Sequence, residues 1–201
     1  MTQTAKSQAI ILDNTRSCDN KNRVVVFTEK YGKLVSSVAG YGKPVNHWGG
    51  AFEGGNILEL SFLKRGDFYT ITGWEIIYSL QDKSVMDFAA RELILGATNE
   101  LLPLNDPEPV LFRWLVWCLA PYGERKLYAY LARLIYHGGF LDFSDKMIVR
   151  VLEKNFEEYL EKNAPGELAE LLRREVDVIQ NFTGYPLTSY DFFKKTVGEK
   201  R

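Results

Sequence analysis

Over the first 80 residues, hydrophobic and polar positions alternate with a period of two, which is typical of β-strands with one buried face. In residues 57–63, Leu58, Leu60 and Phe62 share one face and polar residues share the other. A hairpin is predicted around Thr28–Gly32, because Gly32 can adopt the positive φ of a tight turn. Five strands are expected, over residues 7–12, 24–27, 33–39, 57–63 and 68–78. Short strands broken by glycines favour a small closed barrel, with an OB-fold as the leading candidate and an SH3-like barrel as the alternative.

From about residue 81 the hydrophobic period changes to 3.6, which predicts helices. Ser84 is expected to cap the first helix, Ser144 to start the fourth and Ser189 to cap the last. Six helices are expected, over about residues 85–101, 111–118, 124–136, 145–160, 167–182 and 190–197. The change of period therefore predicts an α+β chain with an N-terminal OB-fold domain over 1–80 and an all-α domain over 81–201.

Composition is that of an ordinary globular protein, with 46% hydrophobic residues, 25% charged residues and a formal net charge of −1. Cys18 and Cys118 form no Cys-x-x-Cys motif; one long-range disulfide is conceivable, but two free thiols in a reducing compartment are expected. The longest apolar run, Leu111–Ala120, contains Arg113 and is too short to span a bilayer. Without a secretory segment either, a cytoplasmic location is expected.

Basic residues gather near the N-terminus, where residues 1–50 hold seven Lys and Arg against three Asp and Glu. Such a local excess permits a nucleic-acid footprint on a nearly neutral chain. An ordinary solvated surface is the alternative for any single side chain. The candidate phosphate contacts are Arg16, Lys21, Arg23, Lys33 and Lys43.

A loop rich in glycine follows the hairpin and carries Tyr41, His47 and Trp48. An aromatic side chain in such a loop can stack on an unpaired base, so these three residues are candidate DNA contacts. The alternative is that Trp48 folds back and is buried at the end of the barrel.

No catalytic, metal or cofactor site is predicted. His47 and His137 have no Cys, His or carboxylate at a ligand spacing, and no Ser-His-Asp arrangement can be assembled locally. The glycines of 49–55 are not followed by Gly-Lys-Ser/Thr, so they do not form a phosphate-binding loop. The sequence therefore contains no set of residues that supports a hydrolase or a metalloenzyme.

The hairpin and the following loop, FTEKYGKL (27–34) and VAGYGK (38–43), resemble the N-terminal domain of the RecO family of bacterial recombination mediators. Further matching segments follow in the same order, at 49–52, 57–60, 73–75, 125–138 and 182–193. The chain departs from the family in two places. Residues 137–145 lack the four cysteines that hold zinc in many members, and the loop after the hairpin carries fewer basic residues.

The resemblance implies a non-enzymatic mediator of DNA repair and recombination. Its OB-fold would bind single- and double-stranded DNA, anneal complementary strands and, together with RecR, help load RecA on DNA coated with the single-stranded DNA-binding protein SSB. In the helical part, an apolar pocket edged by Arg125, Lys126 and Arg133 would receive the acidic tail of SSB. A monomer in the bacterial cytoplasm, associated with the nucleoid, is expected. The alternative is a protein-interaction adaptor of the same fold with little affinity for DNA.

Overall fold

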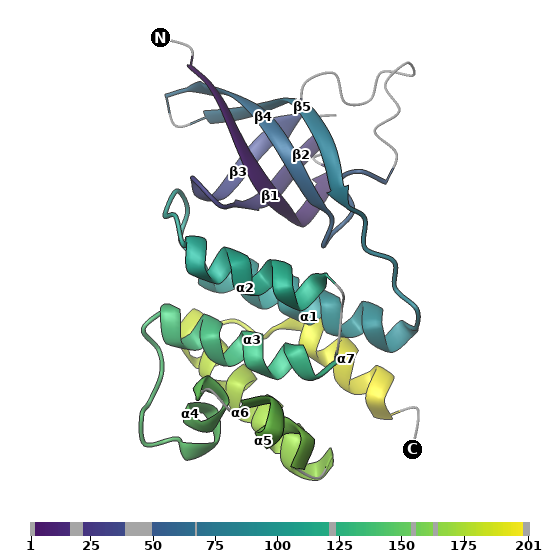
Figure 1. The fold of residues 1–201 in the computed structure, drawn as a ribbon, viewed down its shortest axis with the longest axis vertical. Helices are drawn as coiled ribbons and strands as arrows, with labels where there is room; N and C mark the ends of the chain where they lie inside the picture. Colours follow the sequence, from purple (N-terminus) through teal and green to yellow (C-terminus); the bar gives the residue numbers. More distant parts are fainter. Residues whose placement is uncertain are drawn as a thin grey trace. The chain divides into compact units, whose positions relative to one another are not determined.

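The computed structural model describes residues 3–16, 22–38, 50–66, 68–120, 124–153, 156–162 and 165–198. The chain forms two compact units (Figure 1). The first comprises Met1–Gln81 and Leu102–Val116, and the second comprises Asp82–Leu101 and Trp117–Arg201. In addition to the five strands, the first unit thus includes a later segment of the chain.

Five strands close into a barrel in the order β1-β2-β3-β5-β4. They are β1 (Gln3–Arg16), β2 (Asn22–Thr28), β3 (Gly32–Val38), β4 (Ile57–Arg65) and β5 (Phe68–Tyr78). All pairs are antiparallel except β3 with β5. Long β1 closes the barrel by pairing with both β2 and β4, and its ladder with β2 shifts register between Ile11 and Asp13. This Greek-key barrel is the predicted OB-fold, and the predicted α+β class is confirmed.

The interior of the barrel is filled by side chains that alternate along the strands, as predicted. Leu58, Leu60 and Phe62 of β4 are fully buried, whereas Glu59 and Ser61 between them are only partly buried. The other buried hydrophobic residues of this core are Ala9, Ile11, Val24, Val26, Leu34, Val38, Ala51, Phe52, Tyr69 and Ile71. Burial of this one-sided pattern provides the main driving force for closing the barrel.

The predicted hairpin joins β2 and β3. The Thr28 hydroxyl accepts a hydrogen bond from the Tyr31 amide at 3.0 Å and donates one to the Gly32 carbonyl at 2.9 Å. Gly32 has φ of 71°, so the turn uses the left-handed conformation that glycine permits.

Leu102–Val116 packs on the barrel and belongs to the first unit. The Asn105 amide donates to the Lys33 carbonyl at 2.9 Å, and Leu104 forms a parallel bridge with Lys33. Helix α2 (Pro109–Leu119) follows, and its Phe112 contacts Phe27 of β2 edge-to-face at 5.6 Å between ring centroids. This segment therefore covers the outer side of β2 near the hairpin turn.

The second unit is helical. Besides the end of α2, it contains α1 (Val85–Leu101), α3 (Glu124–His137), α4 (Lys146–Leu152), α5 (Phe156–Lys162), α6 (Pro165–Thr183) and α7 (Thr188–Gly198). The Ser84 hydroxyl accepts from the Asp87 amide at 3.1 Å, which confirms the predicted cap of α1. Buried Thr98 and Tyr130 hydroxyls, 2.8 Å apart, link α1 to α3.

Three details of the predicted helices were wrong. The fourth helix is two helices, because Glu153 is extended (φ −69°, ψ 162°) and ends α4. Asp145, not Ser144, caps α4: its carboxylate accepts from the Met147 and Ile148 amides, while the Ser144 amide donates to Asp142. Ser189 lies inside α7, which begins at Thr188, and its hydroxyl faces Gly96 of α1.

Candidate nucleic-acid interface

Two adjacent rows of side chains cross the outer surface of the barrel. In the first row Arg23 of β2 is paired with Ser37 of β3, and Ser37 with Thr70 of β5. The Ser37 and Thr70 hydroxyls lie 3.2 Å apart and share a hydrogen bond. In the second row Val25 pairs with Val35, two residues before Ser37 on β3, and Phe68, two residues before Thr70 on β5, pairs with Arg65 of β4. We call these residues the open barrel face: Arg23, Val25, Val35, Ser37, Arg65, Phe68 and Thr70.

The open barrel face combines an aromatic platform with positive charge and hydroxyl groups. Phe68 is 79% exposed, the largest exposed fraction among the large hydrophobic residues of the described parts. Arg23 and Arg65 are also exposed, and half-buried Val25 and Val35 provide an apolar floor. A flat exposed ring beside guanidinium groups can stack on an unpaired base while the arginines contact phosphates.

Near the hairpin turn, the β2–β3 ladder is covered by Leu104 and Phe112. Lys33 is half-buried and lies beside Leu104, and its ladder partner Phe27 is buried against Phe112. Arg23 lies four residues from Phe27 along β2, roughly 13 Å at the usual rise of a strand. The two predicted phosphate contacts therefore have different surroundings. Arg23 is on the open barrel face, whereas Lys33 lies beside Leu104 and Asn105.

The other predicted DNA contacts are only partly described. Arg16 is the last residue of β1, where its backbone pairs with Asn22. Five of the predicted DNA contacts lie outside the described residues: Lys21, Tyr41, Lys43, His47 and Trp48. Their roles, including the choice between base stacking and burial for Trp48, stay predictions.

Sequence reasoning missed Phe68, Arg65, Ser37 and Thr70 as surface candidates. The alternation of inward and outward side chains along β5 could have identified two of them. Tyr69 belongs to the barrel core, so Phe68 and Thr70 on either side of it must point outward. The strands predicted over 57–63 and 68–78 leave 64–67 between them as a connection. An aromatic residue in an outward phase directly after that connection is the feature that identifies the site.

In the helical unit, two of the predicted partner-binding cations, Lys126 and Arg133, are engaged in internal contacts. The Lys126 ammonium donates to the Trp117 carbonyl at 2.8 Å and lies 4.5 Å from the centre of the Trp117 ring. Arg125 belongs to α3. Arg133 was expected at an exposed rim, but it is 8% exposed.

Arg133 turns inward because its guanidinium satisfies backbone groups inside the unit. It donates to the Ala129 carbonyl at 2.8 Å and to the Val151 carbonyl at 3.4 Å. Burial lowers the pKa of Arg133 to about 10. The side chain therefore ties α3 to the end of α4.

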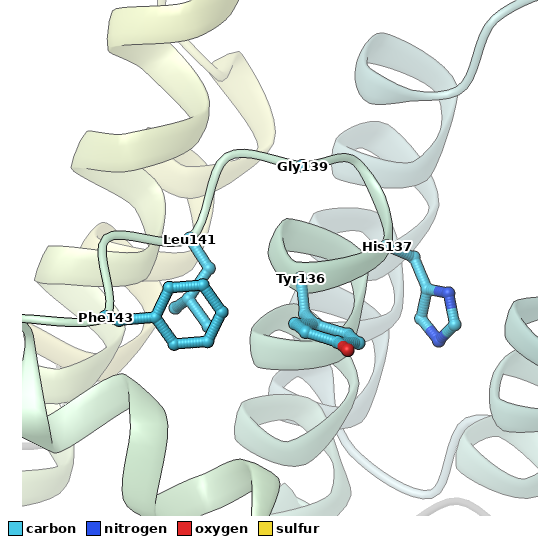
Figure 2. A pocket seen from close by; sticks show the side chains of 5 residues that line it. All are labelled: Tyr136, His137, Gly139, Leu141 and Phe143. Carbon is cyan, nitrogen blue, oxygen red and sulfur yellow. The ribbon is translucent and has the colours of Figure 1, made fainter.

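A surface hollow of about 340 Å³ lies at the connection between α3 and α4 (Figure 2). Its lining residues are Tyr136, His137, Gly139, Leu141 and Phe143. In Figure 2, Leu141 and Phe143 lie close together, and the Tyr136 ring lies between them and His137. Tyr136 and Phe143 are 49% and 73% exposed, so this hollow offers aromatic surface to a partner.

Two further properties of the described residues limit the chemistry. They contain no group of three or more His, Cys, Asp or Glu side chains arranged to hold a metal ion. Within the same residues, no helix combines the length and the apolar character that crossing a membrane requires.

The barrel, its exposed aromatic and basic face, and the helical unit define an OB-fold protein with a helical extension. Residues 1–80 match the family model described as "Recombination protein O N terminal". DNA repair protein RecO of Prosthecochloris aestuarii is 27% identical over 114 residues, which cover 55% of this chain and 43% of that protein. The predicted resemblance to the RecO family is thus confirmed, and residues 1–80 match the N-terminal domain of that family. The match spans less than half of the length of that curated relative.

Proposed function

We propose that this chain is a non-enzymatic DNA repair and recombination mediator whose barrel binds single- and double-stranded DNA. It would anneal complementary strands and, with RecR, help load RecA on DNA coated by SSB. The observation that carries the proposal is the open barrel face, where exposed Phe68 lies with Arg23 and Arg65 on a RecO N-terminal domain.

The chemistry of the open barrel face suits single strands in particular. Stacking on an aromatic ring contributes about 1–3 kcal/mol per base and tolerates any base, since every base has a π-face. Each arginine that neutralises a phosphate releases counterions, so binding weakens as salt rises. Annealing would use the same contacts: two phosphate backbones are neutralised while the base edges remain free to pair.

The footprint is proposed to centre on the Arg23 end of the barrel and not on the hairpin turn. Asn22 and Val38, which border the undescribed connections, are at this end of β2 and β3. The predicted contacts Lys21, Tyr41, Lys43, His47 and Trp48 belong to those connections, and we assign them to the same footprint. Lys33 would contribute less, because Leu104 and Asn105 pack beside it.

Partner contacts are proposed for the helical unit. The hollow lined by Tyr136 and Phe143 can accept the apolar end of a peptide such as the SSB tail, and Arg125 and Lys126 remain the candidate contacts for its acidic residues. Binding of a labelled acidic peptide that ends in an aromatic residue tests this assignment. Phe143→Ala should weaken that binding while leaving DNA binding unchanged.

The decisive experiment is a fluorescence-anisotropy titration of a labelled single strand of ~30 nucleotides, long enough for an OB-fold site of roughly 4–16 nucleotides. Phe68→Ala should weaken binding by about 5- to 150-fold, the equivalent of 1–3 kcal/mol. Arg23→Ala with Arg65→Ala should reduce the salt slope by about 1.4, since each single-strand phosphate contact contributes roughly 0.7.

Ile77→Ala is the matched control, because Ile77 is a 49% exposed apolar residue of the same strand outside the open barrel face. It should bind DNA like the wild type. Equal losses in Phe68→Ala and Ile77→Ala would contradict the proposed footprint. Absence of DNA binding even at low salt would reject the mediator and favour the adaptor, whose contacts would lie around the aromatic hollow.

A further inference from the structure

Glu175 is a buried carboxyl group without a partner in the middle of α6. It is fully buried, and it follows the pattern of α6 residues that pack inward: Leu171, Leu172, Val176 and Ile179. Among the described residues, neither of its carboxyl oxygens has a hydrogen-bond partner. An ionised carboxylate in such a place is strongly disfavoured, and the group retains its proton instead.

The charges around Glu175 do not compensate for this burial. Helix α6 packs against α1, α3 and α4. From α4, the negative Asp145 acts on Glu175; burial first and Asp145 second raise the pKa of Glu175 well above its usual value. From α3, Arg133 donates to the Ala129 and Val151 carbonyls, and from α1, Arg91 pairs with Asp82 and Glu92.

The neighbouring cation on α6 is also engaged elsewhere. The Arg174 guanidinium is 2.9 Å from Glu170 and 3.3 Å from Asp145. It therefore joins α6 to the capping residue of α4, and Glu175 is the next residue of α6. Asp145 at the start of α4 thus has hydrogen-bond donors, whereas the buried Glu175 carboxyl, one residue after Arg174, has none among the described residues.

Helix α4 depends on this junction. It has seven residues, too few to be stable alone in water. Its anchors are the Asp145 cap, the buried side chains of Ile148 and Val151, and the Arg133 bond to its last turn. Loss of a proton from Glu175 to water would place a second negative charge beside Asp145 and draw water into the contact between α4 and α6.

We infer that Glu175 acts as a proton-dependent latch: α4 stays packed on α6 while Glu175 is protonated, and α4 is released when Glu175 ionises. Because the folded state binds this proton more tightly than the unfolded state, the latch is complete below the ordinary pKa of a glutamate. Its contribution is lost progressively as pH rises toward the raised pKa of the folded state.

Hydrogen exchange of the full chain between pH 6 and 9 tests the latch, with protection factors corrected for intrinsic rates. Protection of α4 amides should fall at least tenfold across this range in the wild type and stay constant in Glu175→Gln. Glu167→Gln, at an exposed position on α6, is the matched control and should behave like the wild type.

A wild type whose α4 protection does not change with pH would overturn the inference, as would a Glu175→Gln variant that keeps the wild-type slope. If Glu175→Gln does not fold, Glu175→Met supplies an apolar side chain of similar size and carries the same expectation. A carbon-13 NMR titration of the Glu175 carboxyl gives a direct reading. An ordinary glutamate titration would equally overturn the latch.

Discussion

Gly32 and Gly66 offer a paired test of how the barrel is held to the later segment of the chain. Both adopt positive φ, 71° and 60°, and both lie at turns of the first unit. A Cβ added at Gly66 would meet nothing within 4 Å. A Cβ added at Gly32 would overlap the backbone carbonyl of Asp106, in the segment that leads to α2.

The magnitudes follow from these two environments. A left-handed conformation costs alanine about 1–2 kcal/mol, and the loss of glycine freedom in the unfolded chain offsets about 0.4–1 kcal/mol. Gly66→Ala should therefore reduce the free energy of unfolding by about 1 kcal/mol. Gly32→Ala has the same backbone term plus about 1–3 kcal/mol for forcing packed atoms apart, giving about 2–4 kcal/mol.

Thermal unfolding, with hydrogen exchange to identify the transition of the barrel amides, measures the difference. For a chain of this size Tm should fall by about 2–4 °C per kcal/mol, so Gly32→Ala should lower Tm clearly more than Gly66→Ala. Gly32→Ala should also expose amides of 109–116, because the displaced segment positions the start of α2. Equal shifts, with unchanged exchange in 109–116, would refute the reasoning.

The remaining predictions concern the helical unit. Ser84→Ala should cost about 1 kcal/mol by removing the α1 cap, whereas Ser84→Gly should cost only a few tenths; urea unfolding compares them. Tyr130→Phe removes one buried hydrogen bond while the Thr98 hydroxyl keeps the Ile94 carbonyl at 2.6 Å, and it should cost about 0.5–1.5 kcal/mol. Thr98→Val leaves the buried Tyr130 hydroxyl without Thr98 and should cost about 1–3 kcal/mol, and a double-mutant cycle measures the coupling between the two residues. Burial raises the pKa of the Cys118 thiol, so iodoacetamide at pH 8 should modify Cys118 only after unfolding, as peptide mass spectrometry would show. Rapid labelling in the native state would contradict that burial.

Much of the fold could be predicted because its signals are local. The phase of 57–63, the Thr28–Gly32 turn and the Ser84 cap depend on side chains within a few residues of each other, and all three were confirmed. The end of the helix predicted over 167–182 was also confirmed: α6 ends at Thr183, Gly184 has φ of 72°, and its amide donates to the Gln180 carbonyl. Ser144 and Asp145 are adjacent, and both residue types can cap a helix. The sequence pattern therefore does not show which of the two caps α4.

The sequence by itself determined the barrel and the helices, since period and turn chemistry act within a few residues along the chain. Which parts of the barrel surface remain open was decided only by tertiary structure. Leu102–Val116 packs beside Lys33, while the outward phase of β5 leaves Phe68 exposed on the same barrel face as Arg23. Arg133 likewise turned inward because carbonyls of two helices met there. Exposure and burial of a side chain depend on contacts between residues far apart in sequence, and no local pattern contains them.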